Sequence, residues 1–531
     1  MKDFQYKIYF MIGLLVAISL ASCSKFLEHD DPTNVTDANW WKTEANATSA
    51  LDAVYDGVPD GIYGKQFMFL SALSDELVSR QSARGDYLSY VKGIQGAAWG
   101  VGQDLWNADF QYIRRANRFL ENVDRCFFAD TTLKVRYKYE DRALRAYLHM
   151  ELLMLFGGIP IETNSVTPAS SYLPRDSADQ VYDFVINELT DCANYLPASY
   201  TTSDMKRITS GACWAMITRL ALYYKKYEVA INAARKIIDT GTYSLYTDYS
   251  TLFLYAGELN TERIFYKVIT SNGYSWNTIA PQGAGGKVVL SPTANIVDAF
   301  ETLQGKTMAA LGSDSAAIYR QNPVYKNNRD PRLTASVLLP GQTFGGLTLN
   351  PFNTATSNLD AIGAQYSTAT GYWVNKYLDP KDRSASTANR TLDYMIIRLA
   401  EIYLSYAEAL IESGDWQNTD VLKYINLVRQ RAKMPAASSA DYNTQEQLRD
   451  LVRRERNVEL CFEGIRYFDI RRWGLLGTLM NGTVYGATNP ATGGSPVTVE
   501  ERSCNPARDY LWPIPQSEML ANSSMKQNPN Y

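Results

Sequence analysis

The sequence predicts a mainly α-helical protein built on helix pairs, with loop-rich insertions that carry short β-hairpins. Three observations support this fold class. Apolar residues recur at helical spacing in several segments, and successive helical segments are joined by short turns. Residues 242 to 389 are instead rich in glycine, proline, serine and asparagine. The chain of 531 residues, 46% hydrophobic and 20% charged, is long enough to bury a sizeable core.

The helices are predicted from the N-terminal half onward. In "YEDRALRAYLHMELLMLFGGIP", the residues from Ala143 to Met154 follow an i, i+4, i+7, i+11 pattern, and Gly157 predicts the helix end. "SGACWAMITRLALYYKKYEVAINAARKIIDTG" is typical of two helices with a short Lys-Lys-Tyr break. A unit of this length, with tyrosine and alanine on facing positions, resembles a tetratricopeptide repeat. Such repeats stack because no single unit buries its own apolar face.

Four helix pairs and one further helix are expected along the chain. The last pair turns at Gly414, and the helix that follows it is expected from about Thr444 to Arg472. The expected pairs span about 104–156, 178–225, 209–240 and 395–434, where the second and third overlap. Between them, "RIFYKVI" and "ASVLLP" favour short strands, and "SPTANIVDAFETLQG" favours a helix.

The N-terminal residues predict export and lipidation. Lys2 and Lys7 precede a largely apolar run from 8 to 21, which is the layout of a secretory leader and is shorter than a membrane-spanning helix. "LASC" resembles a bacterial lipobox, so residues 1–22 are predicted to be a lipoprotein signal peptide and Cys23 the lipidated first residue. Acyl chains on Cys23 would tether the protein to a membrane.

The composition excludes several classes of function. With 52 basic and 56 acidic residues, the formal charge of −4 favours neither nucleic acid nor an anionic membrane surface as a partner. Two histidines and no Cys-x-x-Cys motif argue against a metal site. The five remaining cysteines lack paired spacing, so we expect buried thiols without a disulfide framework.

Several long strings along the chain are distinctive: "RRERNVELCFEGIRYFDIRRWG", "NPARDYLWPIPQSEML", "RLAEIYLSYAEAL", "INLVRQRAKMP", "NRDPRL" and the terminal "QNPNY". Together they closely resemble the SusD/RagB family of outer-membrane nutrient-binding lipoproteins. The resemblance implies one SusD-like domain from 23 to 531, with a tetratricopeptide-like part (24–240), a loop-rich insertion (241–390) and a C-terminal part (391–531). It also implies a protein without enzymatic activity or cofactor. Such a protein would face the cell exterior and deliver oligosaccharides to a SusC-like TonB-dependent transporter.

A sugar site needs aromatic platforms with polar groups at their edges. Trp99 lies among glycines in "GIQGAAWGVGQDLW", where a core role in a helix is not expected, and "SNGYSWN" is similar. The resemblance implies aromatic residues with an arginine or asparagine in these two regions. The expected ligand-binding residues are Trp99, Tyr274, Trp276, Arg80, Gln103 and Asn277. Tyr372 and Trp373 are reserve candidates, of which one would pack and the other be exposed if they lie on a strand.

Three alternatives remain open at the level of sequence. A peptide-binding, RagB-like member would favour a deep, polar groove. A glycoside hydrolase would need a pair of carboxylates in a cleft, for which Asp75, Glu76 and Asp86 are available. Glu455 and Glu459 are also i, i+4 neighbours, but the arginines around them favour a structural ion-pair network. A pure helical-repeat scaffold would not need the aromatic-rich insertion.

Overall fold

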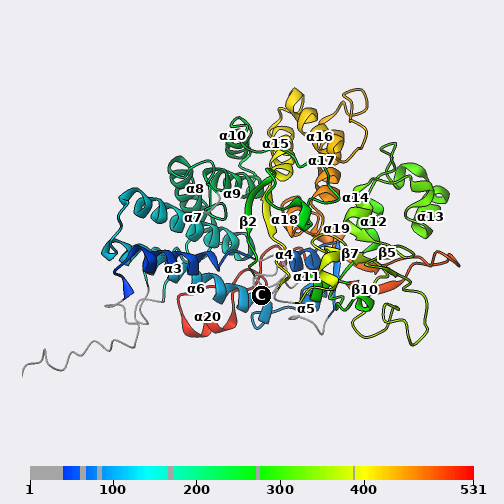
Figure 1. Cartoon of the computed structure of the whole chain (residues 1–531), viewed down its shortest axis with the longest axis horizontal. Coiled ribbons are helices and arrows are strands. Elements are labelled where there is room, and N and C mark those ends of the chain that lie inside the picture. The colour runs from blue at the N-terminus through cyan, green and yellow to red at the C-terminus, as the bar shows by residue number, and fades with distance from the viewer. Residues whose placement is uncertain are drawn as a thin grey trace, which may run out of the picture.

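A computed structural model describes most of the chain, and helices are its main regular secondary structure (Figure 1). The described residues are 40–59, 67–80, 87–165, 172–201, 204–270, 275–386 and 389–531. Cys23, Tyr274 and Asp86 lie outside them, so the predictions for these residues stay predictions. None of the helices in these ranges combines the length and the apolar character needed to cross a membrane.

The N-terminal half is a stack of antiparallel helices, coloured blue to green in Figure 1. Each helix packs against the next one along the chain, from α6 to α10. The helices are α3 (Glu44–Tyr55), α6 (Gly100–Asn122), α7 (Thr131–Phe156), α8 (Ala178–Tyr195), α9 (Ser210–Tyr223) and α10 (Tyr227–Ile238). The predicted helix pairs in this half are therefore confirmed.

Side chains at the helix starts explain where these helices begin. The Gln180 N–H donates to Ser177 Oγ, and the Ser177 N–H donates to Gln180 Oε1, which makes a capping box. Asp130 and Thr209 cap α7 and α9 in a similar way. As expected, α7 ends at Gly157, which has a φ of 77°.

The C-terminal scaffold continues the stack, because α15 packs against α10 as well as against α16 and α17. The elements are β8 (Tyr394–Arg398), α15 (Leu399–Ser413), α16 (Thr419–Arg431), α17 (Gln445–Glu459), α18 (Ile465–Arg472), α19 (Leu476–Leu479), β9 (Gly482–Tyr485), β10 (Thr498–Arg502) and α20 (Gln516–Ala521). The expectation of a single helix from Thr444 to Arg472 is wrong, because this segment forms the two helices α17 and α18. Phe462 and Gly464, at φ of 64° and 74°, separate α17 from α18.

The remaining elements are short. The helices are α4 (Phe67–Leu70), α5 (Tyr87–Val91), α11 (Ser275–Ile279), α12 (Ala294–Ala299), α13 (Ser313–Gln321) and α14 (Arg332–Ser336). The strands are β1 (Leu77–Ser79), β2 (Arg263–Lys267), β3 (Leu290–Pro292), β4 (Val337–Leu338), β5 (Thr343–Phe344), β6 (Leu347–Thr348) and β7 (Trp373–Val374).

These strands form antiparallel pairs, and most of the pairs join distant segments. β1 pairs with β3, β2 with β8, and β4 with β7, while β5 pairs with β6 and β9 with β10 as hairpins. The strand expected in "RIFYKVI" is confirmed as β2. The loop-rich insertion is thus attached to the scaffold at several places by backbone hydrogen bonds.

Buried ion pairs make a further attachment between α14 of the insertion and α17. Arg332, 1% exposed, pairs with Asp330 at 2.7 Å, Glu455 at 2.5 Å and Glu459 at 3.0 Å. Burial alone would raise the pKa of Glu459, but Arg332 and two further arginines hold it well below its usual range. The ion-pair network expected around Glu455 and Glu459 is confirmed, although its arginines come from distant segments. The five expected thiols are all buried and free.

Candidate functional site

A three-residue backbone segment, 287–289, brings two of the predicted site residues together. The Arg80 N–H donates to the Val289 carbonyl at 2.9 Å, and the Lys287 N–H donates to the Asn277 carbonyl at 3.0 Å. The Val289 N–H donates in turn to the Thr278 carbonyl at 2.8 Å. Residues far apart in the sequence, at the end of β1 and in α11, therefore share one surface. We call the residues Arg80, Asn277, Lys287, Tyr366 and Arg390 the 287-segment surface.

The polar side chains of this surface are held in place by the protein. The Arg80 guanidinium is partly exposed and donates to the Ala364 carbonyl at 3.1 Å. The Arg390 guanidinium donates to Asn277 Oδ1 at 2.8 Å, which directs the amide group of Asn277. Lys287 is exposed. The surface therefore offers cationic and amide donors, of which Arg80 and Asn277 are fixed before a ligand arrives.

Tyr366 is an aromatic member of this surface that the sequence reasoning missed. Its ring is half-buried, and the ammonium group of Lys287 lies 5.0 Å from the ring centroid. Its backbone has a φ of 60°, uncommon for a bulky residue, and its carbonyl accepts the Val288 N–H at 3.0 Å. Tyr366 lies in "GAQYSTATG", a run with glycines like the one around Trp99. The criterion used for Trp99, an aromatic residue in a run with glycines, would also have found Tyr366.

Trp276 lies beneath the surface and not on it. The residue is fully buried, and its Nε1–H donates to the Ala284 carbonyl at 3.2 Å. Arg390 lies 5.6 Å from its ring centroid, and the ring of Phe344 lies 5.7 Å away. The expectation of an exposed platform at Trp276 is therefore wrong. The indole supports Arg390, and through it Asn277, from below.

Trp99 belongs to a different aromatic cluster, within the core. It is 5% exposed, its ring stacks on Tyr90 at 5.6 Å, and it meets Trp512 edge to face at 4.8 Å. The expectation that Trp99 is an exposed loop residue is wrong, because it directly precedes α6 and packs against the C-terminal segment. Gln103 is partly exposed in the first turn of α6, and its N–H donates to the Trp99 carbonyl. Its ligand role stays a prediction.

The reserve candidates also belong to the core. Tyr372 is 2% exposed and Trp373 is fully buried, so the expected alternation between a packed and an exposed ring does not occur. The short strand β7 is enclosed by other strands, because it pairs with β4 and also packs against β3. Neither ring is open to a ligand in this structure.

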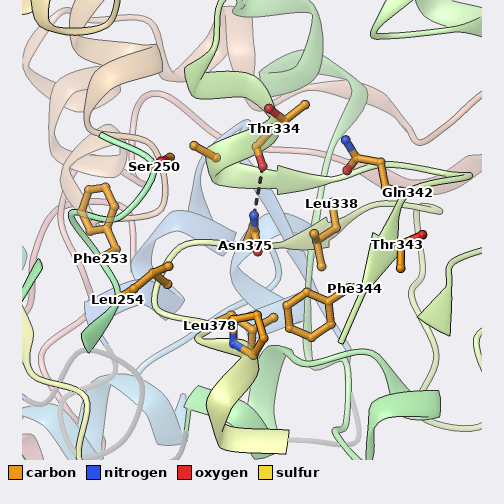
Figure 2. A pocket seen from close by; sticks show the side chains of 12 residues that line it. Ser250, Phe253, Leu254, Thr334, Leu338, Gln342, Thr343, Phe344, Asn375 and Leu378 are labelled. Carbon is orange, nitrogen blue, oxygen red and sulfur yellow. Dashed lines mark hydrogen bonds between the residues drawn. The ribbon is translucent and has the colours of Figure 1, made fainter. Parts of the chain in front are cut away.

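A pocket of about 420 Å³ is lined by Phe344 (Figure 2), whose ring also packs against Trp276. Phe253, Phe344, Leu338 and Leu378 supply apolar walls, and polar side chains such as Gln342 and Thr343 lie at the edge. Asn375 Nδ2 donates to the Thr334 carbonyl at 2.9 Å. None of the described residues that line the pocket has an ionisable side chain, so the pocket suits a small neutral group.

Of the carboxylates considered for hydrolysis, Asp75 and Glu76 lie within the described residues, and both are buried. Asp75 is buried and forms a bidentate ion pair with Arg466 at 2.7 and 2.8 Å. Glu76 is also buried, its carboxylate accepts the Phe462 N–H at 3.2 Å, and burial raises its pKa to about 8. A carboxyl pair for glycoside hydrolysis must reach a bound sugar from both sides. The surroundings of Asp75 and Glu76 are therefore those of structural residues and not of a catalytic pair in a cleft.

Comparison with known proteins assigns the family. The model for the SusD family matches residues 255–531, and the model described as "Starch-binding associating with outer membrane" matches residues 25–222. The chain therefore belongs to the SusD family, as the sequence resemblance indicated. The family description associates these proteins with the outer membrane and with starch.

Individual relatives agree with this assignment over nearly the whole chain. The chain is 24% identical to SusD-like protein P38 of Formosa agariphila, over 98% of both chains. It is 24% identical to the starch-binding protein SusD of Bacteroides thetaiotaomicron, over 82% of both. The crystal structure of a SusD-like carbohydrate-binding protein from Bacteroides fragilis matches with a TM-score of 0.84 and 25% identity, covering 92% of this chain and all of the other.

Proposed function

We propose that this protein captures oligosaccharides at the outer membrane and delivers them to a SusC-like TonB-dependent transporter for import. One observation carries the binding part: the 287-segment surface combines the half-exposed ring of Tyr366 with the donors of Arg80, Lys287 and Asn277. A pyranose has an apolar face and a hydroxyl-rich edge, and it needs both kinds of partner. Relatives described as starch-binding and carbohydrate-binding support this ligand class.

Binding on this surface would be reversible and would need no cofactor. The sugar face stacks on Tyr366, while Arg80 and Asn277 donate to hydroxyl oxygens at the ring edge. Backbone hydrogen bonds to segment 287–289 already hold both residues in position, so little conformational entropy is lost on binding. The lipid on Cys23 would keep the protein facing the cell exterior beside its transporter.

Isothermal titration calorimetry with soluble oligosaccharides and peptides tests the proposal. We expect saturable heat with one glycan class, and we expect Tyr366→Ala to weaken that binding at least about tenfold, which is 1.4 kcal/mol. Tyr172→Ala is the matched control, because Tyr172 is an exposed tyrosine outside this surface. Unchanged affinity in Tyr366→Ala would exclude this surface as the site.

The same titrations separate the alternative functions. Heat with peptides alone would assign the protein to the peptide-binding, RagB-like branch. Reducing ends released during incubation with a glycan would instead support a hydrolase. Transport is tested separately, by co-purification with the transporter from solubilised outer membranes. Absence of a TonB-dependent barrel in that preparation would contradict the delivery role.

A further inference from the structure

A second pocket, of about 390 Å³, lies between α6 and the C-terminal segment that contains α20. In Figure 1, α20 is drawn beside α6, on the other side of the molecule from the loop-rich insertion. None of the residues that line it belongs to the 287-segment surface. Its ligand can therefore be tested independently of the function proposed above.

The floor of this pocket is aromatic. Trp106 is 2% exposed, and its ring meets those of Phe110 at 4.8 Å and Phe156 at 5.0 Å, so the indole is fixed from two sides. Phe110 is partly exposed and lines the same pocket. The floor therefore presents aromatic side chains on one long helix, which suits the apolar face of a ring-shaped ligand.

Polar side chains without internal partners stand above this floor. Asn107, Gln111 and Arg114 follow i, i+4, i+7 spacing on α6, so they share one face of the helix with Phe110. All three are exposed. Within the ranges that the structure describes, none of their side chains makes a hydrogen bond or an ion pair to the protein. Their donors and acceptors are therefore free for a ligand.

Two glutamates form the opposite wall. The Glu162 N–H donates to His149 Nε2 at 3.3 Å, and its carbonyl accepts Asn117 Nδ2 at 3.1 Å, which fixes its backbone against α7 and α6. Glu518 projects from α20. Burial and the charge of Glu518 raise the pKa of Glu162 to about 7, while Arg114 opposes this shift.

This arrangement favours a ligand that brings a positive charge. The two carboxylates repel each other, and a cation placed beside them relieves that repulsion without the uptake of a proton. The remaining titratable neighbour of Glu162, His149, is buried and its pKa is lowered to about 4, so it stays neutral near pH 7. Among the described residues that line the pocket, Arg114 carries the only other charge.

We propose that this pocket is a second ligand site that binds a sugar unit carrying a free, protonated amine. The ring of the sugar lies on Phe110, the ammonium group binds Glu162 and Glu518, and the hydroxyls bind Asn107, Gln111 and Arg114. A lysine side chain would satisfy the carboxylates and would leave the amide and guanidinium groups on α6 without partners. The hydroxyl-rich amino sugar uses both walls and the floor.

Calorimetry at pH 6.5 tests this inference with two oligosaccharides that differ in the amine alone. Short glucosamine oligomers should give saturable heat, and the matched N-acetylglucosamine oligomers should bind at least about tenfold more weakly. Titrations in two buffers of different ionisation enthalpy should show that the glucosamine oligomer displaces a proton from the protein.

Variants separate this site from the first one. Glu518→Gln keeps the size of the side chain and removes its charge, and no hydrogen bond of the Glu518 side chain is lost with it in the described structure. It should weaken binding of the glucosamine oligomer at least about tenfold. Glu228→Gln, an exposed glutamate on α10, and Tyr366→Ala should leave that binding unchanged.

Each opposite outcome overturns the proposal. Equal affinity for the acetylated oligomer would exclude recognition of the amine. Tighter binding of lysine-containing peptides would assign the pocket to peptides. Absence of heat with the glucosamine oligomer, or full affinity in Glu518→Gln, would exclude the pocket as the site. If Tyr366→Ala loses binding of the glucosamine oligomer and Glu518→Gln retains it, the amino sugar binds on the 287-segment surface instead.

Discussion

Replacement of Trp99 by alanine should lower stability and leave glycan binding intact. The ring is 5% exposed and packs against Tyr90 and Trp512, so the substitution leaves a cavity between the start of α6 and the C-terminal segment. Large-to-small replacements of buried aromatic residues cost about 3–5 kcal/mol. With an unfolding entropy of about 2.1 cal/mol/K per residue, or about 1.1 kcal/mol/K for this chain, the melting temperature should fall by about 3–5 °C.

Thermal unfolding and calorimetry on the same preparation check this expectation. The glycan affinity of Trp99→Ala should stay within about twofold of the parent protein, which is less than 0.5 kcal/mol. Tyr366→Ala should show the reverse pattern, with weakened binding and an unchanged melting temperature, because its ring is partly exposed. A Trp99→Ala protein that melts normally and no longer binds glycan would refute the argument from burial.

Three further substitutions test the scaffold. Arg332→Ala leaves its buried carboxylate partners with too little positive charge beside them, so it should lower the free energy of unfolding by about 3–5 kcal/mol in urea denaturation. A loss below about 1 kcal/mol would contradict the role of the network. The pKa of Glu76 is raised to about 8 in the folded state, so the stability that its protonated form contributes is complete below pH 4.5 and is lost as the pH rises towards 8. Glu76→Gln should therefore gain stability relative to the parent protein by about 1.4 kcal/mol per pH unit between pH 5 and 8, and a pH-independent difference would exclude this explanation. Gly158→Ala would place a Cβ atom 2.3 Å from the Asp176 carbonyl oxygen, so it should lower the free energy of unfolding by about 1–3 kcal/mol in urea denaturation. In the control variant Gly96→Ala, the new Cβ atom meets nothing within 4 Å, and stability should not change. Equal stability of the two variants would contradict the close approach at Gly158.

Local signals explain which parts of the fold could be predicted from the sequence. Helical periodicity and the glycine after α7 are properties of neighbouring residues, and the helix pairs they predicted are present. The break between α17 and α18 was missed because Phe462, and not only Gly464, adopts a left-handed backbone conformation. An isolated sequence pattern gives no reason to expect a phenylalanine there.

The site was harder to predict, because exposure depends on contacts between distant segments. Trp99 has the flanking glycines of a surface loop, but Trp512, from the other end of the chain, covers its ring. Arg80 and Asn277 were both expected as ligand-binding residues, and this role stays a prediction; the segment 287–289 that joins them carries no local signal of function. Tyr366 differs from Trp99 in the outcome: both lie in runs that contain glycines, but the ring of Tyr366 is partly exposed and the ring of Trp99 is buried.

The buried ion pairs connect the helical scaffold to the loop-rich insertion, which carries most of the 287-segment surface. Arg332 comes from the insertion, Arg398 from the end of β8, and both reach Glu459 on α17. Buried charges are tolerated only in a geometry that pairs all of them, so the insertion has few alternative positions relative to the helices. Because β2, before α11, pairs with β8, and β3, after α11, pairs with β1, the backbone on both sides of α11 is tied to distant segments. Asn277 is therefore presented from a rigid element, and its alignment with Arg80 precedes ligand binding. A substitution that weakens this ion-pair network, such as Arg332→Ala, should therefore lower the affinity for the glycan, although it changes no residue proposed to touch the sugar.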